Sequence, residues 1–249
     1  MVIKLADRII EIETLYPYTV KLCKDYMAGD ADAGNRPDII ISTDALDIDL
    51  EREKSAREDE VEGREIRVFP DDYLESLAVY RKISEELSAY DTFLFHGSAL
   101  SVDGEGYIFT AASGTGKSTH ARLWREVYGS RAVMINDDKP LIRISGESDY
   151  QPLVYGTPWD GKHRLSSNTS APLKALCILK RGKKNEIERI DAGEAMPMLI
   201  QQAYRPADPA AMAKTLELMD RLVSRVKVYR MECNMDPEAA RLSYEAMSG

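Results

Sequence analysis

A glycine-containing loop between a strand-like and a helix-like segment is the feature that most constrains how this 249-residue sequence folds. It reads Ala111-Ala112-Ser113-Gly114-Thr115-Gly116-Lys117-Ser118-Thr119. It fits the phosphate-binding pattern G-x-x-x-x-G-K-[ST], except that alanine stands at the first glycine position. The apolar segment 106–110 precedes the loop, and the segment after it has helical character up to Gly129. We therefore predict a phosphate-binding loop that joins a buried strand to a helix.

The residue types in this loop match the chemistry of nucleotide phosphates. Gly114 and Gly116 let the backbone turn tightly, so that successive N–H groups point into one concavity. The helix that starts near Lys117 adds its positive end to this anion site. Lys117 is expected to reach the β- and γ-phosphates, and the Ser118 hydroxyl to ligate the Mg²⁺ that bridges them. The alternative interpretation is a glycine turn with a helix-capping serine and a surface lysine. The predicted cofactors are ATP and Mg²⁺, with GTP or pyrophosphate left open as alternatives to ATP. The predicted binding residues are Ser113, Gly114, Thr115, Gly116, Lys117, Ser118 and Thr119.

Two adjacent aspartates follow the next strand-like segment, residues 131–136. Asp137 and Asp138 lie 20 and 21 residues after Lys117, which leaves room for a helix, a loop and a strand. If that strand runs parallel to the one before the loop, both carboxylates reach the same edge of the sheet. One would hold Mg²⁺ beside Ser118, and the other would accept a proton from an attacking hydroxyl. We predict Ser118 and Asp138 as metal ligands and both aspartates with Lys117 as catalytic residues. The identity of the base stays open, and the alternative is a solvated acidic turn.

His96 is positioned by a hairpin signal at 103–106, within a two-strand pattern over 92–111. With a two-residue turn, the numbers of cross-strand partners sum to 207 or 209. His96 then faces residue 111 or 113, at the root of the loop. There it would contact the γ-phosphate or tune the base, or it would only support the loop. We interpret His120, in the first turn of the following helix, as a surface or packing residue.

Two further segments carry residues that can bind or react. Residues 155–165 combine turn formers with Trp159 and His163. They form either a loop that closes over nucleotide or substrate, or a turn between strands with a packed tryptophan. The basic run Lys180–Lys184 is most simply a hairpin tip, and an arginine reaching a phosphate from it is a weaker alternative.

The rest of the pattern indicates a mixed α/β fold. The charge-rich segment 52–67 is interpreted as an exposed connection or the frayed end of a helix. We predict an amino-terminal α+β region over 1–90 and a catalytic domain over 91–249. Strands are expected at 38–43, 173–180, 185–190 and 228–233. Helices are expected within 69–90, where Asp71 or Asp72 can be the cap, at 193–204, at 208–225 and from Asp236 onward, with Asp236 as a cap.

Composition excludes several classes of function. Lys and Arg number 33 against 42 Asp and Glu, so the net charge of −9 disfavours nucleic acid as a partner. No apolar run approaches the ~18 residues that would span a membrane. The three cysteines, Cys23, Cys177 and Cys233, are too few and too far apart for a disulfide framework or a clustered metal site. We therefore expect a cytoplasmic protein.

Three linked motifs resemble a known family. His96-Gly97 before the hairpin, the loop, and Asn136-Asp137-Asp138 are together similar to the catalytic core of HPr kinase/phosphorylase and its phosphoenolpyruvate-carboxykinase-like relatives. The resemblance covers about residues 90–190. The glycine-rich E-I-R-G stretch that takes part in the phosphorylase activity of that family has no clear counterpart here.

The resemblance implies a phosphoenolpyruvate-carboxykinase-type fold with a mixed sheet and Mg²⁺-dependent transfer of phosphate to a serine hydroxyl. Lys117 and Ser118 match the loop lysine and metal ligand, Asp137 and Asp138 match the base and a metal-associated carboxylate, and His96 matches the active-site histidine. The acceptor would be a serine of a protein, a peptide or a small molecule, and a homo-oligomer fits. The alternative function is a non-catalytic ATP-binding switch of the same fold.

Overall fold

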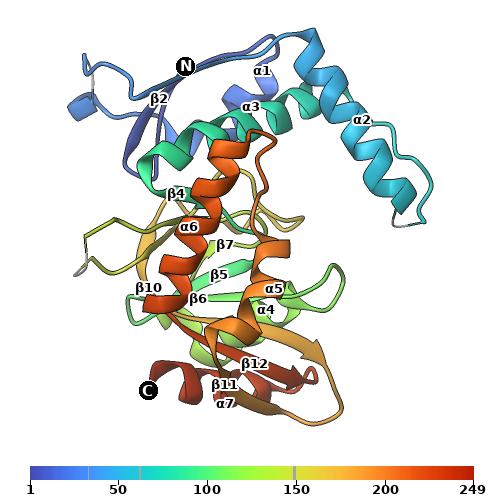
Figure 1. The fold of residues 1–249 in the computed structure, drawn as a ribbon, viewed down its shortest axis with the longest axis vertical. Coiled ribbons are helices and arrows are strands. Elements are labelled where there is room, and N and C mark those ends of the chain that lie inside the picture. The colour runs from blue at the N-terminus through green and yellow to red at the C-terminus, as the bar shows by residue number, and fades with distance from the viewer. Residues whose placement is uncertain (33, 62, 148–149) are drawn as a thin grey trace. The chain divides into compact units, whose positions relative to one another are not determined.

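The computed structural model describes residues 1–32, 34–61, 63–147 and 150–249 (Figure 1). These residues fall into two compact units, Met1–Glu86 and Leu87–Gly249. Strands and helices are interspersed in both, so the fold is mixed α/β with parallel and antiparallel strand pairs. No helix within these ranges combines the length and apolar character needed to span a lipid bilayer.

The first unit contains a three-stranded sheet in the order β1-β2-β3 and three α-helices. The outer strands run antiparallel (β1) and parallel (β3) to β2. A buried carboxylate, Glu75 on α3, accepts hydrogen bonds from the N–H groups of Leu15 and Tyr16 and from the Thr43 hydroxyl, which ties the helix to two connections. The elements are β1 (Val2–Leu5), β2 (Arg8–Glu13), α1 (Pro17–Leu22), β3 (Ile39–Ser42), α2 (Ala45–Val61) and α3 (Asp71–Leu87).

The charge-rich segment 52–67 is mostly helical. Residues 52–61 form the carboxyl-terminal part of α2, so of the two interpretations the end of a helix describes them and the exposed connection does not. The Asp59 side chain is buried and accepts hydrogen bonds from the backbone N–H and the guanidinium of Arg67. The pairing with Arg67 compensates the buried charge of Asp59, which the sequence pattern alone would place in solvent. Residue 62 of the segment lies outside the described residues.

The second unit is built on a nine-stranded mixed sheet. Its long strand β10 pairs with β9 through residues 170–172, and with β6 and β12 along the rest of its length. From β9 the sheet continues to β8 and β4, from β6 to β5 and β7, and from β12 to β11. The strands are β4 (Thr92–Leu94), β5 (Ser98–Val102), β6 (Glu105–Thr110), β7 (Ala132–Asn136), β8 (Leu141–Arg143), β9 (Leu153–Tyr155), β10 (Ser170–Arg181), β11 (Glu186–Ile190) and β12 (Lys227–Cys233).

Strand directions bring four loops to one edge of this sheet. Strands β6, β10 and β12 are parallel neighbours, so their carboxyl ends lie together. Strand β5 lies antiparallel between β6 and β7, which makes β7 run in the same direction as β6. The strand before Asp137 and Asp138 is therefore parallel to the strand before the glycine loop, so the two aspartates lie at the same edge of the sheet as the loop. The predicted hairpin between β10 and β11 is wrong, because β12 lies between these two strands.

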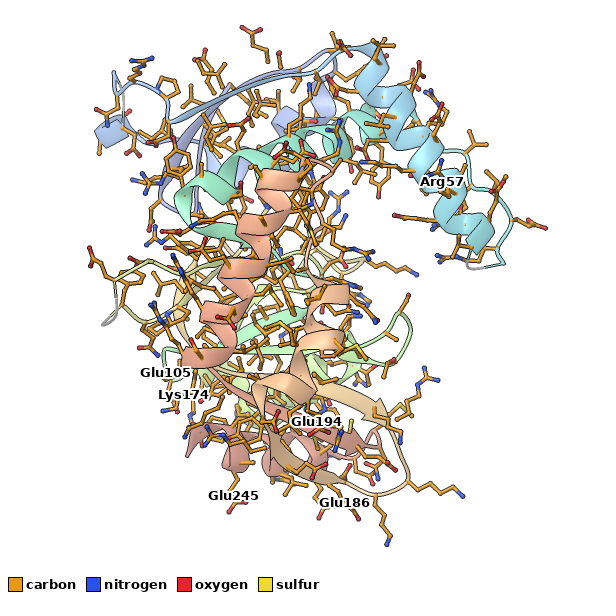
Figure 2. The ribbon with its side chains drawn as sticks, viewed as in Figure 1. Arg57, Glu105, Lys174, Glu186, Glu194 and Glu245 are labelled. Atoms are coloured by element: carbon orange, nitrogen blue, oxygen red, sulfur yellow. The ribbon has the colours of Figure 1, made fainter. Side chains whose placement is uncertain are left out.

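Helices cover both faces of the sheet in the second unit (Figure 1). Because successive strand residues point to opposite faces, Ala175 and Cys177 of β10 pack on one side and Leu176 and Ile178 on the other. The first side is covered by α4 (Lys117–Tyr128) and α7 (Pro237–Ser248), and the second by α5 (Ala192–Gln202) and α6 (Pro209–Arg225). Acidic side chains such as Glu186, Glu194 and Glu245 are exposed at the surface, in keeping with the net charge (Figure 2).

The segment 92–111 forms three strands rather than the predicted two. Strand β4 pairs with β8, whereas β5 pairs with β6 and β7, and the chain changes partners at His96-Gly97. A Cβ at Gly97 would lie 2.9 Å from Ile108 Cγ2 and 3.1 Å from the Phe109 carbonyl oxygen. Only glycine can occupy position 97 without movement of these neighbours. This packing therefore holds the backbone next to His96 at the point where the chain changes strand partners.

Candidate functional site

The glycine loop lies between β6 and α4 with the backbone geometry that its sequence predicts. Gly114 and Gly116 have φ of +72° and +121°, a region that residues with a Cβ rarely adopt. The helix begins at Lys117, whose ammonium donates a hydrogen bond to the Ala111 carbonyl at 3.1 Å. Ala111 itself is fully buried in the core beneath α4, and it is not among the residues with positive φ, so its backbone conformation does not require glycine.

Asp137 lies at the carboxyl end of β7 and contacts two hydroxyl groups. The Ser98 hydroxyl donates to its carboxylate at 2.8 Å, and Ser118 of α4 forms a second hydrogen bond with it. Only 5% of Asp137 is exposed. Burial raises the pKa of this carboxyl group above its ordinary value, although the two hydrogen bonds act in the opposite direction. Ser118 and Asp137 thus present adjacent oxygen atoms beside the loop.

Asp138 faces the opposite way, toward His96. Its carboxylate lies 3.4 Å from His96 Nε2, and its side chain is 34% exposed. Burial acts to raise the pKa of Asp138, but the hydrogen bond from His96 and the charges of Lys139 and Lys117 outweigh it, so the pKa is lowered. The other ring nitrogen of His96 lies 3.1 Å from the Gln202 side-chain oxygen.

Lys117 lies close enough to both carboxylates for their charges to raise the pKa of its ammonium group, against a larger lowering by burial. The structure thus brings together Lys117, Ser118, Asp137, Asp138 and His96. The hairpin pairs Ser98 with Phe109, which is the register in which the numbers of paired residues sum to 207. The His96 backbone lies next to this hairpin, because the Thr110 hydroxyl donates a hydrogen bond to the His96 carbonyl. The carboxylate that contacts Ser118 belongs to Asp137, whereas Asp138, named from the sequence with Ser118 as a metal ligand, contacts His96.

Three residues in the site carry no role in the sequence interpretation. Asn136 accepts hydrogen bonds from the N–H groups of Asp138 and Lys139 through its side-chain oxygen, and its amide donates to the Thr157 and Trp159 carbonyls. Asn136 therefore stabilises the turn that contains the two aspartates. Its place in the Asn-Asp-Asp motif is a sequence feature from which this role could have been predicted. Ser98 and Gln202 have no such signal, because nothing in their local sequence indicates what they contact.

The loop over 156–169 contacts the aspartates as well as carrying a packed tryptophan. Trp159 is buried, and Asn136 holds the loop through the Thr157 and Trp159 carbonyls. A Cβ on Gly161 would lie 3.2 Å from the Asp137 carboxylate, and the charge of His163 acts on the same group. The packed tryptophan agrees with one interpretation of this loop, and its closure over nucleotide or substrate stays a prediction.

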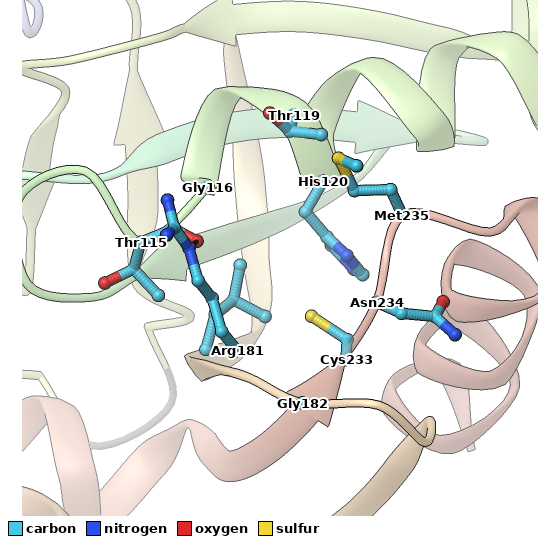
Figure 3. Close-up of a pocket in the computed structure, with 10 residues that line it drawn as sticks. Thr115, Gly116, Thr119, His120, Arg181, Gly182, Cys233, Asn234 and Met235 are labelled. Atoms are coloured by element: carbon cyan, nitrogen blue, oxygen red, sulfur yellow. Dashed lines mark hydrogen bonds between the residues drawn. The ribbon is translucent and has the colours of Figure 1, made fainter.

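Arg181, at the end of β10, holds the glycine loop from outside. Its guanidinium donates to the Gly114 and Thr115 carbonyls. The side chain is exposed and lies beside Thr115 in the close-up view (Figure 3). The basic run 180–184 thus supplies a cation that bonds to the loop backbone, and contact of this arginine with a phosphate stays a prediction.

Two hollows flank the start of α4. A cavity of about 460 Å³ extends from the glycine loop toward the ends of β10 and β12 and is lined by Thr115, Gly116, Thr119, His120, Leu179, Arg181, Gly182, Cys233, Asn234 and Met235 (Figure 3). A second hollow of about 350 Å³ lies on the Asp137 side and includes Ser118, Arg122, Arg125 and His163. The two hollows share Thr119, so the loop and helix start form the wall between them.

Comparisons with known proteins give a matching family model and similarity to solved structures. A family model described as "SynChlorMet cassette protein ScmC" matches residues 72–239. A solved structure of the Hpr(Ser) kinase/phosphatase from Coxiella burnetii is 11% identical in sequence, with a TM-score of 0.33, and covers 63% of this chain and 99% of that one. No curated protein matches the chain.

Proposed function

The chain belongs to the family of the SynChlorMet cassette protein ScmC, and we propose that it is an ATP- and Mg²⁺-dependent kinase that phosphorylates a hydroxyl group. The acceptor we propose is a serine of a protein, a peptide or a small molecule. One observation carries the proposal: a phosphate-type loop with its lysine stands beside two carboxylates at a single edge of the sheet. Phosphoryl transfer requires positioning and charge neutralisation above all, and these groups supply both.

The residues beside the loop fit a Mg²⁺ ion. Mg²⁺ in nucleotide sites is held by one or two protein oxygens together with phosphate oxygens and water. The Ser118 hydroxyl and the Asp137 carboxylate already contact each other and would provide those two oxygens. When bound, the ion neutralises negative charge on the terminal phosphates. Because Asp137 rather than Asp138 contacts Ser118, we assign the metal-side carboxylate to Asp137.

Asp138 is then the proton acceptor. It is about one-third exposed, so an acceptor hydroxyl can reach it, whereas Asp137 is buried. His96 holds the Asp138 carboxylate in place and is itself fixed by Gln202. The lowered pKa of Asp138 keeps it ionised at neutral pH, which is the form that accepts a proton. Lys117 and the loop N–H groups would face the γ-phosphate during transfer.

Phosphate transfer by lysine variants tests this function. Purified protein, Mg·ATP labelled in the γ-phosphate, and acceptors that include free serine and serine-containing peptides are incubated together. We expect wild type and Lys227→Ala, which removes a lysine at the amino end of β12, the opposite end of the strand from the edge that carries the loop, to transfer phosphate. Lys117→Ala should lose about 10²- to 10³-fold in rate, the range for removing one preorganised charge partner. Equal transfer by all three proteins would remove the proposal.

The competing function is an ATP-dependent switch that binds nucleotide without transferring phosphate. The Asp138–His96 pair argues against it, because binding alone needs only the loop and one carboxylate. Mg·ATP binding that depends on Lys117, with no transfer to any acceptor in the screen, would favour the switch.

A further inference from the structure

We propose that the cavity at the ends of β10 and β12 binds the nucleoside part of the nucleotide, with Leu179 and Met235 as its apolar contacts. This inference rests on the proposed function, which puts the terminal phosphates and Mg²⁺ beside Lys117, Ser118 and Asp137. It assigns a binding site to a part of the molecule that the proposed reaction does not otherwise use.

The two hollows beside α4 differ in the charge of the side chains that line them. Besides the Asp137 carboxylate, the smaller hollow is lined by the basic residues Arg122, Arg125 and His163. Among the described residues that line the larger cavity, Arg181 is the only Asp, Glu, Lys or Arg, and its guanidinium is already bonded to the loop backbone. A flat base that covers an ionised side chain removes water from the charge, which costs free energy. The larger cavity imposes less of this cost.

The order of groups along a nucleotide agrees with this choice of cavity. The metal end is set by Ser118 and Asp137, which contact each other and both line the smaller hollow. The nucleoside is at the other end of the phosphate chain, so it extends away from these two residues. Thr115 and Gly116 line the larger cavity where it meets the loop, and Thr119 lines both hollows. A phosphate chain across the start of α4 therefore connects the metal side to the larger cavity.

Met235 is an exposed apolar side chain at this cavity. It follows β12 directly and is 74% exposed, so a ligand that covers it removes apolar surface from water. Its flexible thioether adapts to ring surfaces of varied shape, and the buried Leu179 offers a second apolar surface in the same cavity. Figure 3 shows Arg181 and Met235 on opposite sides of the cavity, with the Cys233 thiol pointing into the space between them.

The size and the polar lining of the cavity also fit this ligand. Its volume of about 460 Å³ lies in the range of small-molecule sites. The Asn234 side chain is engaged in its own turn, because its oxygen accepts from the Asp236 N–H and its amide donates to the Lys183 carbonyl. Asn234 and Arg181 thus already have backbone partners. We therefore expect apolar contact to supply most of the affinity for the nucleoside.

A comparison of ATP with tripolyphosphate isolates the nucleoside, because tripolyphosphate carries the phosphate chain alone. Binding of both Mg²⁺ complexes to wild type, Met235→Ala and Leu216→Ala is measured by calorimetry. Met235→Ala should weaken ATP binding about 3- to 10-fold and change tripolyphosphate binding less than about twofold. Retained tripolyphosphate binding also shows that this variant folds. Leu216→Ala is the matched control, since it removes an exposed apolar side chain from α6 on the other face of the sheet, and should change neither affinity.

The Cys233 thiol gives an independent readout in the wild-type protein. It lines the cavity and is partly exposed, whereas Cys23 and Cys177 are fully buried. Alkylation by N-ethylmaleimide at mildly alkaline pH is followed for each cysteine by mass spectrometry of peptides. We expect Cys233 to react first. Mg·ATP at 10 times its Kd should slow this reaction about 10-fold, and Mg·tripolyphosphate at the same saturation less than about twofold.

Three results would each overturn the inference while leaving the proposed function intact. The first is a Met235→Ala variant that loses ATP and tripolyphosphate binding equally, or loses neither. The second is alkylation of Cys233 that Mg·ATP does not slow. The third is a Cys233 thiol that reacts no faster than Cys177 in the free protein, which would show that the cavity is closed to ligands. Failure of wild type to bind either Mg²⁺ complex would overturn the proposed function as well.

Discussion

Asp137 and Asp138 are adjacent in the chain, yet their environments shift their pKa values in opposite directions. Burial dominates at Asp137, whose partners are the neutral hydroxyls of Ser98 and Ser118. Asp138 gains the His96 contact and the charges of two lysines. The sequence identifies the pair, because its spacing from Lys117 suits a nucleotide site. It does not identify their roles, because those depend on which neighbour each side chain meets across the sheet.

Separate substitutions of the two aspartates should therefore have different effects. We expect Asp138→Asn to reduce the rate of phosphate transfer by about 10²- to 10⁴-fold with nucleotide affinity retained, the usual cost of losing a general base. Asp137→Asn should instead raise the Mg²⁺ concentration that gives half-maximal rate. Initial rates measured across a Mg²⁺ titration, with nucleotide binding measured alongside, distinguish the two. Identical Mg²⁺ profiles for the two variants would contradict the assignment.

The buried His120 predicts a dependence of stability on pH. Its pKa is about 4 in the folded state, against an ordinary value near 6.5 in the unfolded chain. The unfolded state therefore binds the proton first, so the free energy of unfolding decreases as the pH falls from about 6.5 toward 4. Between pH 7 and pH 4.5, wild type should lose about 2 kcal/mol more than His120→Asn, which has no titrating ring.

Urea unfolding of both proteins at each pH measures this difference, and the comparison cancels the titration of the carboxylates that they share. Parallel pH profiles for the two proteins would show that His120 is not buried in its neutral form.

At the level of elements, the sequence predicts those whose local pattern carries the signal. The helix over 71–87 and the helix that ends at Gly129 are confirmed, because apolar spacing and capping residues mark them. The partner of each strand is not local information. The pairing of β12 between β10 and β11, and the change of partners at Gly97, depend on segments far apart in the chain. The same limit hides Gln202, which lies 106 residues after His96.

Two helix starts offer a matched test of capping. Asp208 precedes α6 and its carboxylate accepts a hydrogen bond from the Ala211 N–H at 2.8 Å. Asp236 occupies the same position before α7, as the sequence predicts, but its side chain makes no such bond. Asp208→Ala should lower the free energy of unfolding by about 1 kcal/mol, and Asp236→Ala by much less. Equal losses in chemical denaturation would show that the cap bond does not account for the difference.

On the scale of the molecule, the candidate site belongs entirely to the second compact unit, Leu87–Gly249. Both tryptophans of the chain, Trp124 and Trp159, lie in that unit, so tryptophan fluorescence reports its unfolding alone. Mg·ATP at 100 times its Kd should stabilise the folded state by about 2.7 kcal/mol. For a unit of this size, that corresponds to a rise in Tm of about 5–10 °C.

Lys117→Ala is the control for this measurement, since it removes the loop ammonium and should show little or no rise in Tm with the same nucleotide. A rise of equal size in wild type and Lys117→Ala would locate the nucleotide away from the glycine loop.

The bond between His120 and Ser243 joins residues 123 positions apart, and strand β6 acquires its parallel neighbours only from β10 and β12. During translation, the glycine loop leaves the ribosome long before these partners are made. A nascent chain that stops short of β12 therefore lacks the part of the cavity wall formed by Cys233, Asn234 and Met235, and its incomplete sheet exposes unpaired strand edges to other chains. The parallel strands beside the glycine loop are therefore complete only after β12 has been synthesised.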